Sequence, residues 1–314
     1  MVEAYLISHD GKSYELPNLL EWKFSYGRGL PCDAFEVSFI YDKSMLSVLT
    51  AANRFRAEHE EETVFTGLVD DFEISISENG SLVTVNGRGL AALLLDNEAE
   101  AAQYYSASLD MLLEKYVYPL GLNEVKISAD IPRQAFDIES GASHWKVLES
   151  FLWFACGIKP RFSKDGVLLI GETAGKSLSF DESSAYTKQA LKRKRYGVIS
   201  EVLVKNKALG TSERVENSEF IQSGGCCRRV VNVPRKTRFD AMRATGEYQI
   251  AQSKVDEQLI SLTVPQIFAA FPGDTIEFID SHLGVSEEFM VQGSCCFANG
   301  ERAGTEITLT KNEV

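Results

Sequence analysis

Apolar and polar residues alternate through the segment Gln258-Leu259-Ile260-Ser261-Leu262-Thr263-Val264. A period of two indicates a strand with one buried face. A polar, alanine-containing helix pattern precedes this segment at residues 240–254, and the turn sequence Pro272-Gly273-Asp274 follows it. Three further strand patterns lie at residues 275–279, 288–292 and 306–310. The C-terminal region therefore predicts a helix followed by an antiparallel sheet that curls on itself.

The N-terminal region has the same period. Aromatic residues alternate with polar ones at residues 21–26 and 35–41, so each stretch predicts a half-buried strand with its aromatic side chains on one face. Asp42 or Ser44 can cap a helix over residues 45–53. Asn79-Gly80 is typical of a tight hairpin between two further alternating stretches. This region is expected to form a small barrel or a strongly curled sheet.

The pattern changes in the middle of the chain. Ser108 and Ser143 each precede a helical pattern, and Gly157 is placed to end the second helix. A strand is expected at residues 125–128, and a hairpin is expected around the turn Lys164-Asp165-Gly166. These features predict a compact α+β unit.

The whole chain is therefore predicted to be α+β and mainly β. Two small β-barrel domains, at residues 1–92 and 176–314, are expected to flank a central α+β domain at residues 93–175, and the second barrel domain is expected to include a helix. With 314 residues, 44% hydrophobic and 25% charged, the chain is long enough for several domains and an ordinary core. Its apolar runs are too short for a membrane span, and its first residues do not resemble a secretory signal.

Charge is unevenly distributed along the sequence. The net charge is −13, but residues 188–243 contain fourteen basic and five acidic residues, a local charge of +9, which leaves −22 on the remainder. An acidic chain with one basic segment is a poor nucleic-acid binder, and sequence-specific nucleic acid is not an expected partner. The segment suits an electrostatically matched protein interface. The candidate interface residues are Lys192, Arg193, Lys194, Arg195, Arg228 and Arg229.

Motifs for chemistry are weak. The six cysteines have no C-x-x-C spacing, the four histidines are scattered, and no pair of carboxylates stands out among 45 acidic residues. The stretch Gly87-Arg88-Gly89-Leu90-Ala91-Ala92 fits G-x-G-x-x-A, but the strand before it alternates, whereas a dinucleotide-binding strand is continuously apolar. Glu58-His59-Glu60-Glu61-Glu62 reads as a solvated loop rather than a cation site. We therefore predict no catalytic residue, no cofactor, no metal and no enzymatic activity.

The order of several short motifs resembles the baseplate hub proteins of contractile phage tails and phage-tail-like bacteriocins, the late control protein D family. The resemblance spans nearly the whole chain. It is carried by Phe65-Thr66-Gly67-Leu68-Val69-Asp70, Val85-Asn86-Gly87-Arg88-Gly89-Leu90, Ser143-His144-Trp145-Lys146-Val147-Leu148 and Phe271-Pro272-Gly273-Asp274-Thr275-Ile276. The basic stretch at 188–195 and the excursion at 207–234 match no motif of that family.

This resemblance implies a homotrimeric ring that joins the six-fold tail tube to the three-fold central spike. The implied partners are copies of the same chain, the tail tube protein and the central spike protein, with tape-measure and baseplate wedge proteins as further candidates. Assembly in the cytoplasm of a bacterial host and residence in the baseplate are implied as well. The alternatives are a tail-associated cell-wall hydrolase and a glycan-binding module.

Overall fold

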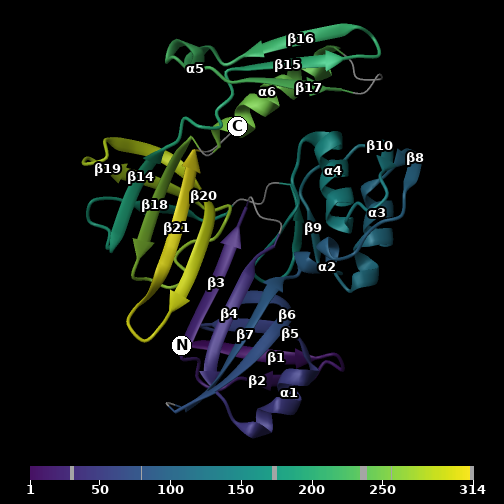
Figure 1. The fold of residues 1–314 in the computed structure, drawn as a ribbon. Helices are drawn as coiled ribbons and strands as arrows, with labels where there is room; N and C mark the ends of the chain where they lie inside the picture. Colours follow the sequence, from purple (N-terminus) through teal and green to yellow (C-terminus); the bar gives the residue numbers. More distant parts are fainter. Residues whose placement is uncertain (29–31, 79, 172–174, 234–238, 256, 312–314) are drawn as a thin grey trace. The chain divides into compact units, whose positions relative to one another are not determined.

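The computed structural model describes residues 1–28, 32–78, 80–171, 175–233, 239–255 and 257–311 (Figure 1). Contacts between residues divide the chain into two compact units. Unit 1 comprises Met1–Lys176, Val264–Asp274 and Gln292–Ile307, and unit 2 comprises Ser177–Thr263, Thr275–Val291 and Thr308–Val314. Two C-terminal segments therefore return to the unit that contains the N-terminus. The predicted boundaries at residues 92 and 175 stay a prediction.

Unit 1 contains a large antiparallel sheet. Its strands are β1 (Val2–Ser8), β2 (Ser13–Glu15), β3 (Glu21–Gly27), β4 (Ala34–Ile40), β5 (Ala52–His59), β6 (Glu62–Ser77), β7 (Gly80–Gly89) and the end of β20 (Val285–Ala298). They are ordered β20-β3-β4-β7-β6-β5-β1-β2. The C-terminal strand β20 pairs with β3, with Ala298 opposite Trp22. The alternating aromatic stretches are thus confirmed as adjacent strands.

An aromatic cluster fills the core beside this sheet. Phe24, Phe35, Phe55 and Phe65 are nearly inaccessible to solvent, and the rings of Phe35 and Phe55 are stacked 3.9 Å apart. Trp22 is also buried, with its ring stacked on that of Phe268 at 5.5 Å. Rings of this size remove large apolar areas from water, so this cluster is the main source of hydrophobic stabilisation in the sheet.

The helix predicted at residues 45–53 is shorter than expected. A 3₁₀ turn, η1 (Lys43–Met45), leads into α1 (Leu46–Ala51), and Ala52 already begins strand β5. Asp42 is the capping residue, because its Oδ1 accepts a hydrogen bond from Ser44 N at 2.8 Å. Strand β5 begins early because Phe55 pairs with Leu6 of β1 and enters the core. Long-range packing therefore overrides the local helical pattern.

The glycines of the G-x-G-x-x-A motif lie in strand β7. A side chain on Gly87 would overlap the carbonyl oxygen of Leu68 and the ring of Phe35. A bulge in β6 sets Asp70 out of register. Arg88 Nε lies 2.7 Å from Asp70 Oδ2, and Arg88 Nη2 lies 2.8 Å from Asp96 Oδ2. These residues therefore serve close packing and an ion-pair network.

The central part of unit 1 packs helices on two small sheets. Its elements are α2 (Ala91–Leu95), β8 (Ala102–Ala107), α3 (Leu109–Tyr116), η2 (Tyr118–Leu120), β9 (Val125–Ile127), β10 (Gln134–Ile138), α4 (His144–Cys156), β11 (Arg161–Phe162) and β12 (Leu168–Ile170). Ser108 caps α3 by accepting from Met111 N, Ser143 caps α4 by accepting from Lys146 N, and Gly157 ends α4 with φ +72°. These predicted helix ends are confirmed, whereas β8 and β10 were not predicted.

Unit 2 contains strands and one long helix. Its elements are β13 (Ser177–Phe180), β14 (Lys188–Arg193), β15 (Glu201–Asn206), β16 (Thr211–Glu216), α5 (Ser218–Gln222), β17 (Arg228–Asn232), α6 (Phe239–Lys254), β18 (Gln258–Val264), β19 (Thr275–Asp280), the first part of β20, and the end of β21 (Ala303–Lys311). Strands β16, β15 and β17 form a separate sheet, and α6 packs against it (Figure 1). The segment at 207–233, which matched no motif, therefore folds into two strands and a short helix. Pro234 lies outside the described residues.

The predicted fold class is confirmed. Strands account for 48% of the structure and helices for 19%, so the chain is α+β and mainly β. The helix predicted at 240–254 and the strand at 258–264 match α6 and β18 closely. Closure of the two end sheets into barrels stays a prediction.

The packing at Gly87 predicts a large loss of stability in Gly87→Ala. The added methyl group has no space between β6 and the Phe35 ring, so the free energy of unfolding should fall by about 3 kcal/mol or more. Urea unfolding followed by circular dichroism measures the change. Gly300→Ala is the matched control, because a methyl group there meets nothing within 4 Å and should change stability little. Equal stability of the two variants would contradict this account of the motif.

Candidate functional site

The six predicted interface residues lie in two places in unit 2. Lys192 and Arg193 are exposed at the end of β14, and Lys194 and Arg195 follow directly. Arg195 Nη2 donates to the carbonyl oxygen of Ser223 at 2.6 Å, and its guanidinium lies over the Phe220 ring. Arg195 is therefore held by α5 and the turn after it.

Arg228 and Arg229 are both exposed on β17, but strand alternation separates them. Arg228 is opposite Glu201 of β15, and Arg229 is opposite the buried Val202. Arg228 Nε lies 2.9 Å from Glu201 Oε1. The two arginines therefore belong to opposite faces of the sheet, and one of them already has an acidic partner within unit 2. A role for the six residues in binding a partner stays a prediction.

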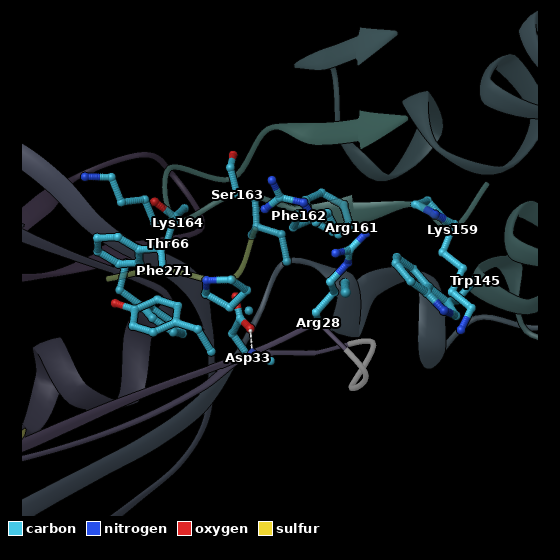
Figure 2. Close-up of a pocket in the computed structure, with 18 of the residues that line it drawn as sticks. Arg28, Asp33, Thr66, Trp145, Lys159, Arg161, Phe162, Ser163, Lys164 and Phe271 are labelled. Atoms are coloured by element: carbon cyan, nitrogen blue, oxygen red, sulfur yellow. Dashed lines mark hydrogen bonds between the residues drawn. The ribbon is translucent and has the colours of Figure 1, made fainter. Parts of the chain in front are cut away.

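The pocket in Figure 2 is a cavity of about 200 Å³ in unit 1. Residues from six separated stretches of the sequence line it. They are Tyr26, Gly27, Arg28, Asp33, Phe65, Thr66, Gly89, Leu90, Ala91, Trp145, Glu149, Lys159, Pro160, Arg161, Phe162, Ser163, Lys164, Phe271 and Pro272. Strands β3, β6 and β7, helix α4, and the segment from residue 159 to β11 and its turn therefore meet at this point.

Asp33 is one of two carboxylates that line the cavity. Its Oδ1 accepts a hydrogen bond from Gly27 N at 3.1 Å (Figure 2). Burial raises the pKa of Asp33 from 3.8 to about 6, although the Gly27 hydrogen bond and the positive charge of Arg161 act in the opposite direction. The backbone of Asp33 is fixed as well, because Gly89 N donates to its carbonyl oxygen at 2.8 Å.

Arg161 and Arg28 face the same space (Figure 2). Burial lowers the pKa of Arg161, and the positive charge of Arg28 lowers it further, while Asp274 and Asp33 act in the opposite direction. The two guanidinium groups therefore repel each other across this space. A negative group placed between the two guanidinium groups would reduce this repulsion.

The sequence Pro272-Gly273-Asp274 forms the turn beside Arg161. Gly273 has φ +97°, and a side chain there would lie 2.9 Å from Arg161 Nη2. The carboxylate of Asp274 accepts hydrogen bonds from Phe271 N at 2.8 Å and from Lys176 N at 2.7 Å. The left-handed conformation therefore favours glycine at this position of the turn.

Lys164 anchors another side of the cavity. Its Nζ lies 2.9 Å from Glu62 Oε2 and 5.0 Å from the centroid of the Phe271 ring. The contact to Glu62 lowers the pKa of that carboxyl. Glu60 and Glu61, predicted as part of a solvated acidic loop, form the tight turn between β5 and β6 with positive φ, and Glu62 begins β6. The hairpin turn thus brings one acidic residue to Lys164.

The sequence patterns did not predict this cavity. Its charged residues fall into two groups, one at residues 28 and 33 and the other between residues 149 and 164, and more than a hundred positions separate the two groups. The described lining residues include no histidine or cysteine, and the charged ones are four cations and two carboxylates. This arrangement is suited to holding a negatively charged group.

Neither the protein-family models nor the curated proteins include a match to this chain. Solved structures do match it over nearly its whole length. A tail protein from Neisseria meningitidis is 16% identical with a TM-score of 0.81, covering 99% of this chain and 97% of that one. The 43 kDa tail protein of prophage MuSo2 from Shewanella oneidensis is 18% identical with a TM-score of 0.81, covering 99% and 98%.

A more distant similarity extends to secretion machinery. A component of the Escherichia coli type VI secretion system, described as structurally similar to the bacteriophage T4 tail proteins gp27 and gp5, matches with 12% identity and a TM-score of 0.60 over 93% of this chain and 73% of that one. The chain therefore has the fold of phage tail proteins, as the sequence motifs predicted. Among the described helices, none is long and apolar enough to cross a membrane.

The environment of Asp33 predicts a pH dependence of stability that Asp33→Asn removes. A carboxyl whose pKa is raised on folding contributes stability below about pH 4, and this contribution is lost as the pH rises through 6. The difference in unfolding free energy, variant minus wild type, should therefore increase by about 3 kcal/mol from pH 4 to pH 7.5. Urea unfolding at the two pH values measures it.

Asp137→Asn is the matched control, because Asp137 is an exposed carboxylate on β10. The difference in unfolding free energy between Asp137→Asn and wild type should change little with pH. If the difference in unfolding free energy between Asp33→Asn and wild type does not change with pH, Asp33 is better solvated than its position in the cavity wall implies.

Proposed function

We propose that this chain is a structural baseplate hub of a phage tail or tail-like particle. The observation that carries the proposal is the match to two tail proteins with TM-scores of 0.81 over 99% of the chain. A fold retained over the full length at 16% and 18% identity indicates that the arrangement of elements is under constraint. The ordered motifs that resemble baseplate hub proteins favour the hub position within the tail.

In this role the chain forms a homotrimeric ring between the six-fold tail tube and the three-fold central spike. A trimer whose chains each contribute two related surfaces presents six similar sites on one side and three on the other. Such a ring reconciles the two symmetries without requiring identical chains to adopt different shapes. The proposed partners are copies of the chain, the tube protein and the spike protein, with tape-measure and wedge proteins as further candidates.

The proposed action is mechanical rather than enzymatic. The side chains that line the described cavity hold charge and pack aromatic rings, and the ion pairs of Arg88 and Arg228 link neighbouring strands. Assembly in the host cytoplasm, followed by residence in the baseplate, fits this role. A tail-associated hydrolase or glycan-binding module would need a site that takes sugar chains. The tryptophan of the N-terminal sheet, Trp22, is a core residue and is not exposed for stacking on a sugar.

The proposal predicts that the purified full chain is a trimer. Native mass spectrometry should give three times the monomer mass at micromolar concentration, because the ring is the unit that enters the baseplate. A monomer at all concentrations, also in the presence of the tube and spike proteins, would contradict the hub assignment. Lysis of peptidoglycan by the chain alone would favour the hydrolase alternative.

The basic residues at the end of β14 predict a partner contact. Lys192→Glu/Arg193→Glu reverses two exposed charges, so it should weaken binding to an acidic tail partner by about tenfold or more without changing the trimer mass. Pull-down assays at increasing concentrations of the tube and spike proteins measure the loss of affinity. The control Lys126→Glu/Arg133→Glu also reverses two exposed cations, on unit 1, and should retain binding. Equal binding by both variants would remove the β14 residues from the interface.

A further inference from the structure

Cations outnumber carboxylates among the residues that line the cavity of unit 1. Its wall contains four cations, Arg28, Lys159, Arg161 and Lys164, but only the carboxylates Asp33 and Glu149. The whole chain, by contrast, has 45 acidic and 32 basic residues. Cations that gather in one cavity of an acidic protein create a local potential that attracts negative groups.

The charges in the wall have different roles. Lys164 is held by Glu62 and the Phe271 ring, so it forms a fixed side of the cavity. Asp33 receives the Gly27 hydrogen bond, and its raised pKa means that it partly loses its negative charge in mildly acidic solution. Arg28 and Arg161 face the same space, and each is a planar fork that can donate two hydrogen bonds to one carboxylate.

The size of the cavity restricts the ligand. A volume of about 200 Å³ is below the range of roughly 300–1,000 Å³ that is typical of pockets for drug-sized molecules and cofactors. Trp145, Phe162 and Phe271 supply flat apolar walls around the charged groups. This combination fits one side chain with a short apolar stem and a carboxylate end.

We propose that this cavity binds an acidic side chain from a neighbouring copy of the chain, with the carboxylate held between Arg28 and Arg161. The proposed hub function supplies the neighbour, because copies lie side by side in a trimeric ring. The acidic residues of the chain supply the ligand, since the residues outside 188–243 have a net charge of −22. Each copy thus offers acidic segments, and each offers a cationic cavity to receive one.

The first experiment tests the site without requiring assembly. Glutarate mimics a glutamate side chain, and 50 mM glutarate should raise the midpoint of thermal unfolding by about 2 °C relative to sodium chloride at the same ionic strength. Arg161→Gln and Arg28→Gln should each abolish the rise, and the exposed Arg28 provides a second variant if Arg161→Gln folds poorly. Lys126→Gln, which removes an exposed cation outside the cavity, should retain it.

Two results would overturn the assignment of a carboxylate ligand. One is a glutarate effect of equal size in wild type and in Arg28→Gln. The other is stabilisation by sodium phosphate, at the same ionic strength, with no effect of glutarate, which would indicate a phosphate site instead.

The second experiment tests the source of the ligand. The photoreactive residue p-benzoylphenylalanine replaces Lys159 at the edge of the cavity, and the trimer is irradiated and digested. Mass spectrometry should find residue 159 joined to an acidic segment of a second copy, whereas the same probe at Lys126 should not give that product. If the protein is a trimer and gives no such product, the proposal that a neighbouring copy supplies the acidic side chain is wrong. A monomer would refute the hub proposal and the neighbouring-copy occupant together, while the glutarate shift would still decide whether the cavity binds carboxylate.

Discussion

The aromatic core of unit 1 is the interaction on which the rest of that unit depends. Phe24 of β3 lies near Phe55 and Phe65 of the N-terminal sheet and also near Phe268, which enters from the C-terminal part of the chain. Tyr26 contacts Phe271 in the same way, edge to face at 5.1 Å. The N-terminal sheet therefore completes its core only when residues 264–274 have returned to it. The loop-closure entropy of that return is offset by burial of the large rings.

The packing of residues 264–274 against the N-terminal sheet also positions one wall of the cavity. Phe271 is at once a core ring and a cavity wall, and the turn that follows it places Gly273 against Arg161 and Asp274 against the backbone of Phe271 and Lys176. The arrangement of the charged groups around the cavity thus depends on a long-range contact rather than on a local motif. A change in the aromatic core should propagate to the charged groups through Phe271.

Sequence patterns predicted the parts of this fold that are locally determined. Period-two alternation identified β3, β4 and β18, and serine and glycine positions identified the ends of α3 and α4, because these features depend on nearest neighbours. The strands β16 and β17 were missed, since their exposed faces are rich in charge and their alternation is weak. The cavity was missed because Arg28 and Arg161 are far apart in the sequence and converge only through the fold. The basic cluster at 192–195 could be recognised in the sequence by counting charges. That Arg228 and Arg229 lie on opposite faces of a sheet became clear only from the structure, because β17 was not predicted as a strand.

The central claim is that a chain with the fold of phage tail proteins acts as the symmetry adaptor at the end of a tail. The most direct measurement is an electron cryomicroscopy reconstruction of tail particles that contain this chain. The account predicts three copies in one ring, in contact with the last ring of the tube on one side and with the spike on the other. Particles that contain the chain in a different copy number, or only at a position away from the tube axis, would contradict it.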